Sequence, residues 1–259
     1  MKEDLKIALL QFDLVWEDAE KNRNQIEGFL VCINSVDVIL LPEMFSTGFS
    51  VKSTHLAETM QGETVEWMKK IAHKKDAVIC GSLMIIDAEN IYNRLLWVEP
   101  NGTIQHYDKR HLFSLINEEK HITAGNNRLI VWYKGWKICP LICYDLRFPV
   151  FSRNDVNYDL CFYLANWPAT RISAWDTLLK ARAIENQSYI IGVNRVGVDG
   201  YNAEYSGHSQ VFDPMGEVTA AAPENEIGWI EVSLSKDHLT KTRSRMPFLL
   251  DIDCFNLLG

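Results

Sequence analysis

The sequence predicts an α/β (α+β) fold in which stacked β-sheets are covered by helices. Two observations carry this prediction. Short, unbroken apolar runs rich in Val, Ile and Leu recur along the chain, as in strands buried on both faces. Longer segments between some of them carry apolar residues three and four positions apart, as in helices that cover a sheet. With 259 residues, 47% of them hydrophobic, the chain can bury a large core.

The first half alternates strands with two helices. Residues 5–12 form an apolar run, and residues 18–33 show helical spacing of apolar residues. Thr64 is predicted to cap the second helix, whose inner face starts at Val65. Further strands are predicted over residues 36–41, 77–86, 91–98 and 103–107. No period holds over residues 111–126, and the length of this segment predicts a functional loop.

The second half repeats the alternation. A hairpin around Lys134-Gly135 is predicted from the two strand patterns over residues 128–133 and 136–142. Further strands are predicted over residues 159–165, 189–196, 209–212, 218–222 and 228–232, and helices over 173–186 and 235–243. Because no repeat, linker or compositional break divides the chain, one domain over residues 1–259 is expected.

Charge and cysteine usage narrow the class of protein. The formal net charge is −8 and no Lys/Arg cluster overrides it, so binding to nucleic acid or to an anionic membrane is disfavoured. The start runs directly into a strand pattern, and no apolar run reaches about 18 residues, so neither a signal peptide nor a membrane span is expected. The six cysteines show no CxxC spacing and no dense disulfide pattern, which favours a reducing, cytoplasmic location.

Three polar residues stand directly after strand patterns. Cys143 follows residues 136–142, at a bend where its sulfur would lie beside the next backbone N–H. Glu43 and Lys109 follow two other strand patterns. Taken singly, such a cysteine is often a small buried hydrophobe, such a glutamate often caps or pairs, and such a lysine often lies in a solvated turn.

Together, these residues supply the parts for acyl transfer through a thioester. A carboxylate can take the thiol proton and later return it to the leaving amine, so no histidine is required. A nearby ammonium would lower the thiol pKa and stabilise the tetrahedral oxyanion. We expect that oxyanion between the Lys109 ammonium and the backbone N–H of Tyr144, with Glu43 as base and Cys143 as nucleophile.

The motifs around these residues resemble those of the nitrilase (carbon–nitrogen hydrolase) superfamily over nearly the full chain. The matching segments are Leu41-Pro42-Glu43-Met44-Phe45, Asp108-Lys109-Arg110-His111-Leu112-Phe113 and Ile142-Cys143-Tyr144-Asp145-Leu146-Arg147-Phe148-Pro149. The resemblance implies a four-layer αββα sandwich, a homodimer, and neither metal nor organic cofactor. It also implies a second catalytic glutamate between the Lys and Cys motifs, for which Glu118 fits the spacing best and Glu119 is the alternative.

Further segments carry a finer resemblance: Tyr107-Asp108-Lys109-Arg110-His111-Leu112-Phe113, Leu164-Ala165-Asn166-Trp167-Pro168, Lys180-Ala181-Arg182-Ala183-Ile184-Glu185-Asn186-Gln187 and Gly192-Val193-Asn194-Arg195-Val196-Gly197. On these, the chain resembles the bacterial YafV-type omega-amidases, which hydrolyse the side-chain amide of 2-oxoglutaramate. This resemblance implies a small-molecule amide as substrate, with a carboxylate at the opposite end. Arg171 is our candidate for binding that carboxylate, although a surface ion pair would explain it equally well. Phe113, Trp167 and Phe49 are candidate pocket walls. Arg147 and Arg195 are interpreted as structural.

Other functions stay open at this point. An N-carbamoyl hydrolase, an amidase for another small acid and a true nitrilase would use the same catalytic set, because specificity lies in pocket contacts. A non-catalytic relative that binds a metabolite is an alternative of another class. A thiol oxidoreductase is disfavoured because no resolving cysteine stands in a CxxC arrangement.

Overall fold

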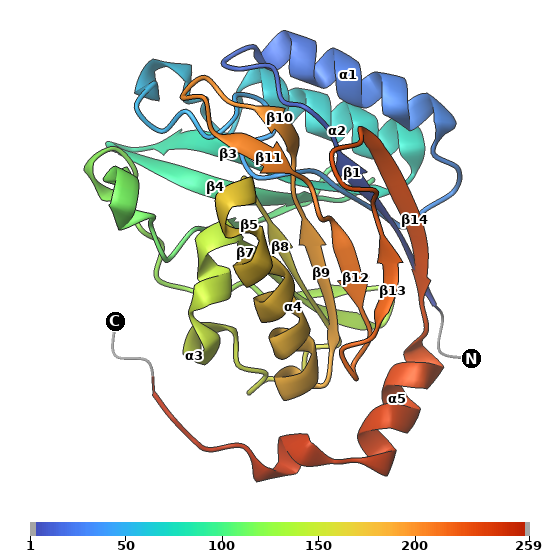
Figure 1. The fold of residues 1–259 in the computed structure, drawn as a ribbon. Coiled ribbons are helices and arrows are strands. Elements are labelled where there is room, and N and C mark those ends of the chain that lie inside the picture. Colours follow the sequence, from blue (N-terminus) through green and yellow to red (C-terminus); the bar gives the residue numbers. More distant parts are fainter. Residues whose placement is uncertain (1–3, 257–259) are drawn as a thin grey trace.

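The computed structural model describes residues 4–256, which form two six-stranded sheets packed face to face (Figure 1). The helices α1 (Ala19–Cys32) and α2 (Glu63–Lys75) cover the first sheet, whereas α3 (Pro149–Ser152) and α4 (Ile172–Asn186) cover the second. This αββα arrangement confirms the predicted fold class. Residues 1–3 and 257–259, which the predicted domain includes, lie outside the described residues.

The two sheets differ in strand order but not in size. The first has the order β14-β1-β2-β3-β4-β5 and is built from β14 (Gly228–Leu234), β1 (Leu5–Gln11), β2 (Val38–Leu40), β3 (Val78–Asp87), β4 (Asn90–Val98) and β5 (Ile104–Asp108). The second has the order β13-β12-β9-β8-β7-β6 and is built from β13 (Val218–Ala221), β12 (Gln210–Phe212), β9 (Tyr189–Val193), β8 (Leu160–Leu164), β7 (Trp136–Ile142) and β6 (Val131–Tyr133). A separate ribbon joins β10 (Val196–Val198) to β11 (Glu204–Ser206), and α5 (Lys236–Arg245) follows β14.

Alternation of side chains along the strands explains the layers. In β1, Leu5, Ile7 and Leu9 pack into the core between the two sheets, whereas Ala8 and Leu10 pack into the core beneath α1 and α2. Strands with apolar residues on both faces must be covered on both faces. The unbroken apolar run in the sequence therefore has its physical cause in this four-layer packing.

The directions of the strands bring together the carboxyl ends that precede the candidate functional residues. The strands β1, β2 and β3 are parallel, and β5 runs in the same direction as β3 because β4 is antiparallel to both. In the second sheet β7, β8 and β9 are parallel. The carboxyl ends of β2 and β5 therefore meet at one edge of the first sheet, and those of β7 and β8 meet at one edge of the second.

Most predicted elements are confirmed, and two predictions are wrong. Gly62, not Thr64, is the N-cap of α2, because the Glu58 carboxylate accepts from the Thr64 N–H at 2.7 Å and the helix begins two residues earlier than predicted. The strand predicted over residues 189–196 breaks at Asn194, whose backbone N–H is hydrogen-bonded to the Ser209 hydroxyl, so that β10 leaves the sheet. The predicted loop over residues 111–126 contains only two short 3-10 turns, η2 (Ser114–Ile116) and η3 (Glu118–Lys120). Within residues 4–256, no helix has the length and apolar character needed to cross a membrane.

Candidate active site

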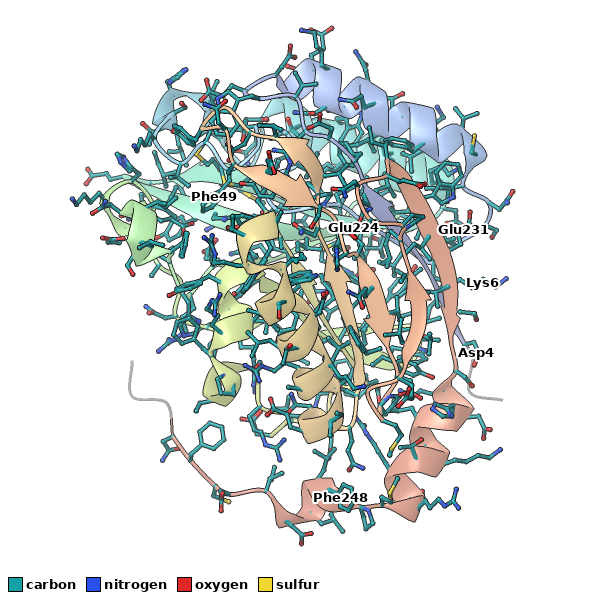
Figure 2. All side chains as sticks on the ribbon, in the orientation of Figure 1. Asp4, Lys6, Phe49, Glu224, Glu231 and Phe248 are labelled. Atoms are coloured by element: carbon teal, nitrogen blue, oxygen red, sulfur yellow. The ribbon has the colours of Figure 1, made fainter. Side chains whose placement is uncertain are left out.

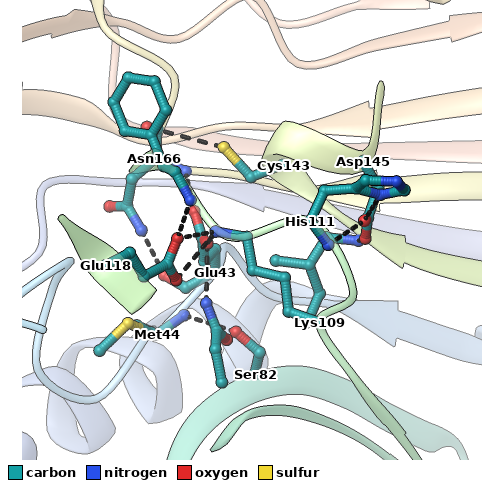
Figure 3. A network of polar contacts seen from close by, with 12 residues as sticks. Glu43, Met44, Ser82, Lys109, His111, Glu118, Cys143, Asp145 and Asn166 are labelled. Atoms are coloured by element: carbon teal, nitrogen blue, oxygen red, sulfur yellow. Dashed lines mark hydrogen bonds and ion pairs between the residues drawn. The ribbon is translucent and has the colours of Figure 1, made fainter. Parts of the chain in front are cut away.

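Three strand ends and one loop bring four predicted residues together (Figure 3). Glu43 follows β2, Lys109 follows β5, and Cys143 follows β7 as the first residue of the 3-10 turn η4 (Cys143–Arg147). The Lys109 Nζ lies 2.9 Å from Glu43 Oε1 and 3.0 Å from Glu118 Oε2, and all three side chains are fully buried. An ammonium thus lies between two carboxylates in the interior of the protein.

The Glu43 carboxylate is held from both sheets. Its Oε1 accepts hydrogen bonds at 2.9 Å from Lys109 Nζ and from Asn93 Nδ2, and its Oε2 accepts from the Asn166 backbone N–H at 2.9 Å. Asn166 follows β8, and its carbonyl oxygen lies 3.9 Å from Cys143 Sγ. The carboxylate and the thiol are therefore both in contact with the chain around Asn166.

The loop over residues 111–126 supplies the second carboxylate. Glu118 is buried and accepts from both Lys109 Nζ and the Phe113 N–H, the latter at 2.6 Å. Glu119 is exposed and is not among the ion-pair partners of Lys109 within residues 4–256. Of the two glutamates that the sequence left as alternatives, Glu118 is thus the one that lies beside Lys109.

Burial and charge set the protonation states. Burial alone would lower the pKa of Lys109, but the charges of Glu118 and Glu43 outweigh it and hold this pKa above its usual value. Burial raises the pKa of Glu118 despite the opposing charge of Lys109. Burial also raises the pKa of the Cys143 thiol well above its usual value, and the charge of Glu43 adds to this. Lys109 lowers the thiol pKa as predicted, but its effect is outweighed, so the thiol is protonated at neutral pH.

A cavity of about 310 Å³ opens beside the cluster and is lined by Cys143, Lys109 and Asn166. The aromatic residues proposed as walls, Phe113, Trp167 and Phe49, also line it. The centre of the Phe49 ring (labelled in Figure 2) lies 4.9 Å from Lys109 Nζ. Tyr144, whose backbone N–H is the predicted second oxyanion donor, lies at the same cavity.

Cationic side chains other than Lys109 also face this cavity. The Arg171 guanidinium lies 5.2 Å from the centre of the Phe113 ring, and that of Arg147 lies 4.8 Å from the centre of the Trp167 ring. Lys52 lines the cavity as well. None of these three cations has an acidic partner among the ion pairs of the described chain. Arg147, interpreted from sequence as structural, is thus a cavity residue, whereas Arg195 is buried and bonded to Asp13 as expected of a structural side chain.

Sequence reasoning missed Asn93, Asn166 and Arg147. Asn166 directly follows a predicted strand, so the rule that identified Glu43, Lys109 and Cys143 also applies to it. Asn93 lies inside β4, where no local pattern distinguishes it from other polar residues. Within residues 4–256, no three His, Cys, Asp or Glu side chains are grouped so that they could hold a metal ion.

Comparison with known proteins agrees with this geometry. The family model for carbon–nitrogen hydrolases matches residues 6–244. The omega-amidase YafV of Escherichia coli K12 is 47% identical, with 98% of each chain covered, and the 2-oxoglutaramate amidase of Bacillus subtilis is 32% identical, with 95% of this chain and 96% of that one covered. A crystal structure of a CN-hydrolase superfamily protein from Xanthomonas campestris, with an arsenic adduct in its active site, superimposes with a TM-score of 0.96 at 42% identity and covers 98% of this chain and 99% of that one. The protein is thus an amidohydrolase of the nitrilase superfamily, and the chain belongs to the carbon–nitrogen hydrolase family.

Proposed function

We propose that the protein hydrolyses the side-chain amide of a small 2-oxo acid, such as 2-oxoglutaramate or 2-oxosuccinamate, to the dicarboxylate and ammonia. The observation that carries this proposal is one cavity, beside the buried carboxylates, whose lining includes the Cys143 thiol, the Lys109 ammonium and further cations without acidic partners. The cluster suits attack on an amide, and the cations suit the carboxylate at the other end of the substrate. Relatives named omega-amidase and 2-oxoglutaramate amidase support the same substrate class.

In the first half-reaction, Cys143 Sγ attacks the amide carbon while Glu43 accepts the thiol proton. The raised pKa of the thiol, caused by burial and by the charge of Glu43, favours proton transfer during the attack over a preformed thiolate. The oxyanion forms between Lys109 Nζ and the Tyr144 N–H. Collapse of the tetrahedral intermediate breaks the C–N bond, and Glu43 gives its proton to the departing nitrogen. Ammonia leaves and a thioester remains.

In the second half-reaction, water attacks the thioester carbon and Glu43 takes the water proton. The same oxyanion donors stabilise the second tetrahedral intermediate. The C–S bond then breaks, the sulfur regains a proton from Glu43, and the dicarboxylate leaves. Glu118 acts through Lys109, because its two oxygens lie 3.1 and 3.0 Å from Nζ and fix the direction of the ammonium.

The free carboxylate of the substrate is proposed to bind Arg171. Arg171 lines the same cavity as Cys143, and its guanidinium lies over the Phe113 ring, which favours the cation at this position. Arg147 provides a second cation at the cavity. Charge-assisted hydrogen bonds from arginine to a carboxylate are strong enough to discriminate between acidic and neutral amides.

The Glu43→Gln variant separates a general-base mechanism from one with a resting thiolate. Removing the Glu43 charge should lower the pKa of the Cys143 thiol, so the thiolate absorbance should appear at lower pH than in the wild type. Turnover should nevertheless fall by about 10²- to 10⁴-fold, because the proton acceptor is lost. Cys143→Ala is the control, because it should abolish both the thiolate absorbance of Cys143 and the turnover. If Glu43→Gln kept or gained activity, the proposed role of Glu43 would be wrong.

A substrate panel tests the proposed reaction. Ammonia release should be measured with 2-oxoglutaramate, 2-oxosuccinamate, glutamine, N-carbamoyl amino acids and simple nitriles. We expect the highest kcat/KM for the two 2-oxo acid amides, because they carry both an amide for the thiol and a carboxylate for the cations that line the cavity. Hydrolysis confined to carbamoyl compounds or nitriles would refute the substrate assignment, and no hydrolysis of any compound would favour a binding protein.

Arg171→Met tests the carboxylate partner. The methionine keeps apolar contact with Phe113 but removes the charge, so KM for 2-oxoglutaramate should rise about 10- to 100-fold, as expected for the loss of a charged hydrogen bond of about 1.5–3 kcal/mol. The KM for an amide of equal length without a carboxylate should not change. Arg245→Met, at an exposed site on α5, is the matched control. An unchanged KM for 2-oxoglutaramate in Arg171→Met would exclude this residue as the partner.

A further inference from the structure

A buried carboxylate that the proposed reaction does not use lies beside the nucleophile. Asp145 is fully buried in η4, two residues after Cys143. Its Oδ2 accepts from the Ile142 N–H at 3.0 Å and from the Tyr107 hydroxyl at 2.8 Å. Its Oδ1 accepts from the His111 N–H at 3.1 Å and lies 2.7 Å from His111 Nδ1 (Figure 3). One side chain thus makes four polar contacts.

These contacts join the two segments that carry the reacting groups. Tyr107 and His111 stand two residues before and two residues after Lys109, and Ile142 stands directly before Cys143. The first segment leaves the first sheet at β5, and the second leaves the second sheet at β7. Asp145 therefore connects the backbone around the ammonium with the backbone around the thiol, across the two sheets.

The local backbone shows why such a connection is needed. Cys143 has φ of +39°, in the left-handed region that non-glycine residues adopt only at a cost. A bend of this kind persists only where its surroundings fix it. The hydrogen bond from the Ile142 N–H to Asp145 holds the backbone N–H of the residue directly before the bend. The imidazole of His111, which holds the other oxygen of Asp145, is itself stacked on the Phe148 ring at 3.8 Å with the planes 5° apart.

We propose that Asp145 and His111 are positioning residues, which set the placement of Lys109 Nζ relative to Cys143 Sγ through their hydrogen bond. This inference rests on the proposed catalytic roles of Cys143 and Lys109, but not on the identity of the amide. When the hydrogen bond between Asp145 and His111 is lost, Lys109 Nζ and Cys143 Sγ can move apart. A displacement of about 1 Å is enough to lower the rate roughly 10²-fold. Substrate binding at Arg171 is left intact.

Matched variants of His111 separate the hydrogen bond from packing. His111→Asn keeps an N–H donor close to the position of Nδ1 but loses the stacking, whereas His111→Phe keeps the stacking on Phe148 and loses the donor. We expect His111→Phe to lower kcat about 10- to 100-fold with little change in KM. His111→Asn should retain most of the wild-type kcat. Asp145→Asn, which keeps the shape but replaces one acceptor oxygen by a donor, should lose kcat like His111→Phe.

The rates are compared with the wild type on whichever amide of the panel it hydrolyses best, per mole of folded protein established by circular dichroism and thermal melting. Alkylation of Cys143 by iodoacetamide gives a second readout that needs no substrate, and it should slow in His111→Phe but not in His111→Asn. If the proposed function is wrong, the wild type hydrolyses none of the amides. The alkylation rates of Cys143 then still test the roles of Asp145 and His111. The inference would be overturned if His111→Phe kept the kcat and the Cys143 alkylation rate of the wild type. It would also be overturned if His111→Phe and His111→Asn lost kcat to the same extent.

Discussion

The rest of the site depends on the buried ammonium of Lys109. Each charge placed in a protein interior costs several kcal/mol unless a partner of opposite charge is placed beside it. Glu43 and Glu118 provide these partners at 2.9 and 3.0 Å. Since Glu43 follows β2, Lys109 follows β5 and Glu118 lies in the loop over residues 111–126, these charges meet only when the sheet edge and the loop have both formed. The charge cluster is therefore assembled only as the sheet edge and the loop fold correctly.

Two backbone bends aim the reacting groups at each other. Met44, directly after Glu43, and Cys143 both have positive φ, which costs about 1 kcal/mol or more at each residue. Polar side chains hold both bends. The Ser82 hydroxyl accepts from the Met44 N–H at 2.8 Å, Asn166 Nδ2 donates to the Glu43 carbonyl at 2.7 Å, and Asp145 accepts from the N–H of the residue before Cys143. The strain lies next to the carboxylate and the thiol, where it determines their direction.

The sequence predicted the layers, most strands and the three strand-end residues, because apolar patterns and strand ends are local properties. What it could not predict depends on contacts between distant segments. The strand-end position of Asn166 is a local signal, but its hydrogen bond to Glu43 spans 123 positions, and that of Asn93 spans 50. The helix start at Thr64 was wrong because the competing acceptor is the side chain of Glu58. The net direction of the Cys143 pKa was missed because burial, which follows only from packing, outweighs the effect of Lys109.

A double-mutant cycle between Lys109 and Glu118 tests most directly whether the ammonium organises the site. Lys109→Met leaves two buried carboxylates without a positive charge beside them, so it should lower the free energy of unfolding by about 3–5 kcal/mol. Adding Glu118→Gln should restore part of that loss, with a coupling of about 1 kcal/mol or more, while turnover stays lost. Effects that add within about 0.5 kcal/mol, or near-normal turnover in Lys109→Met, would contradict the account.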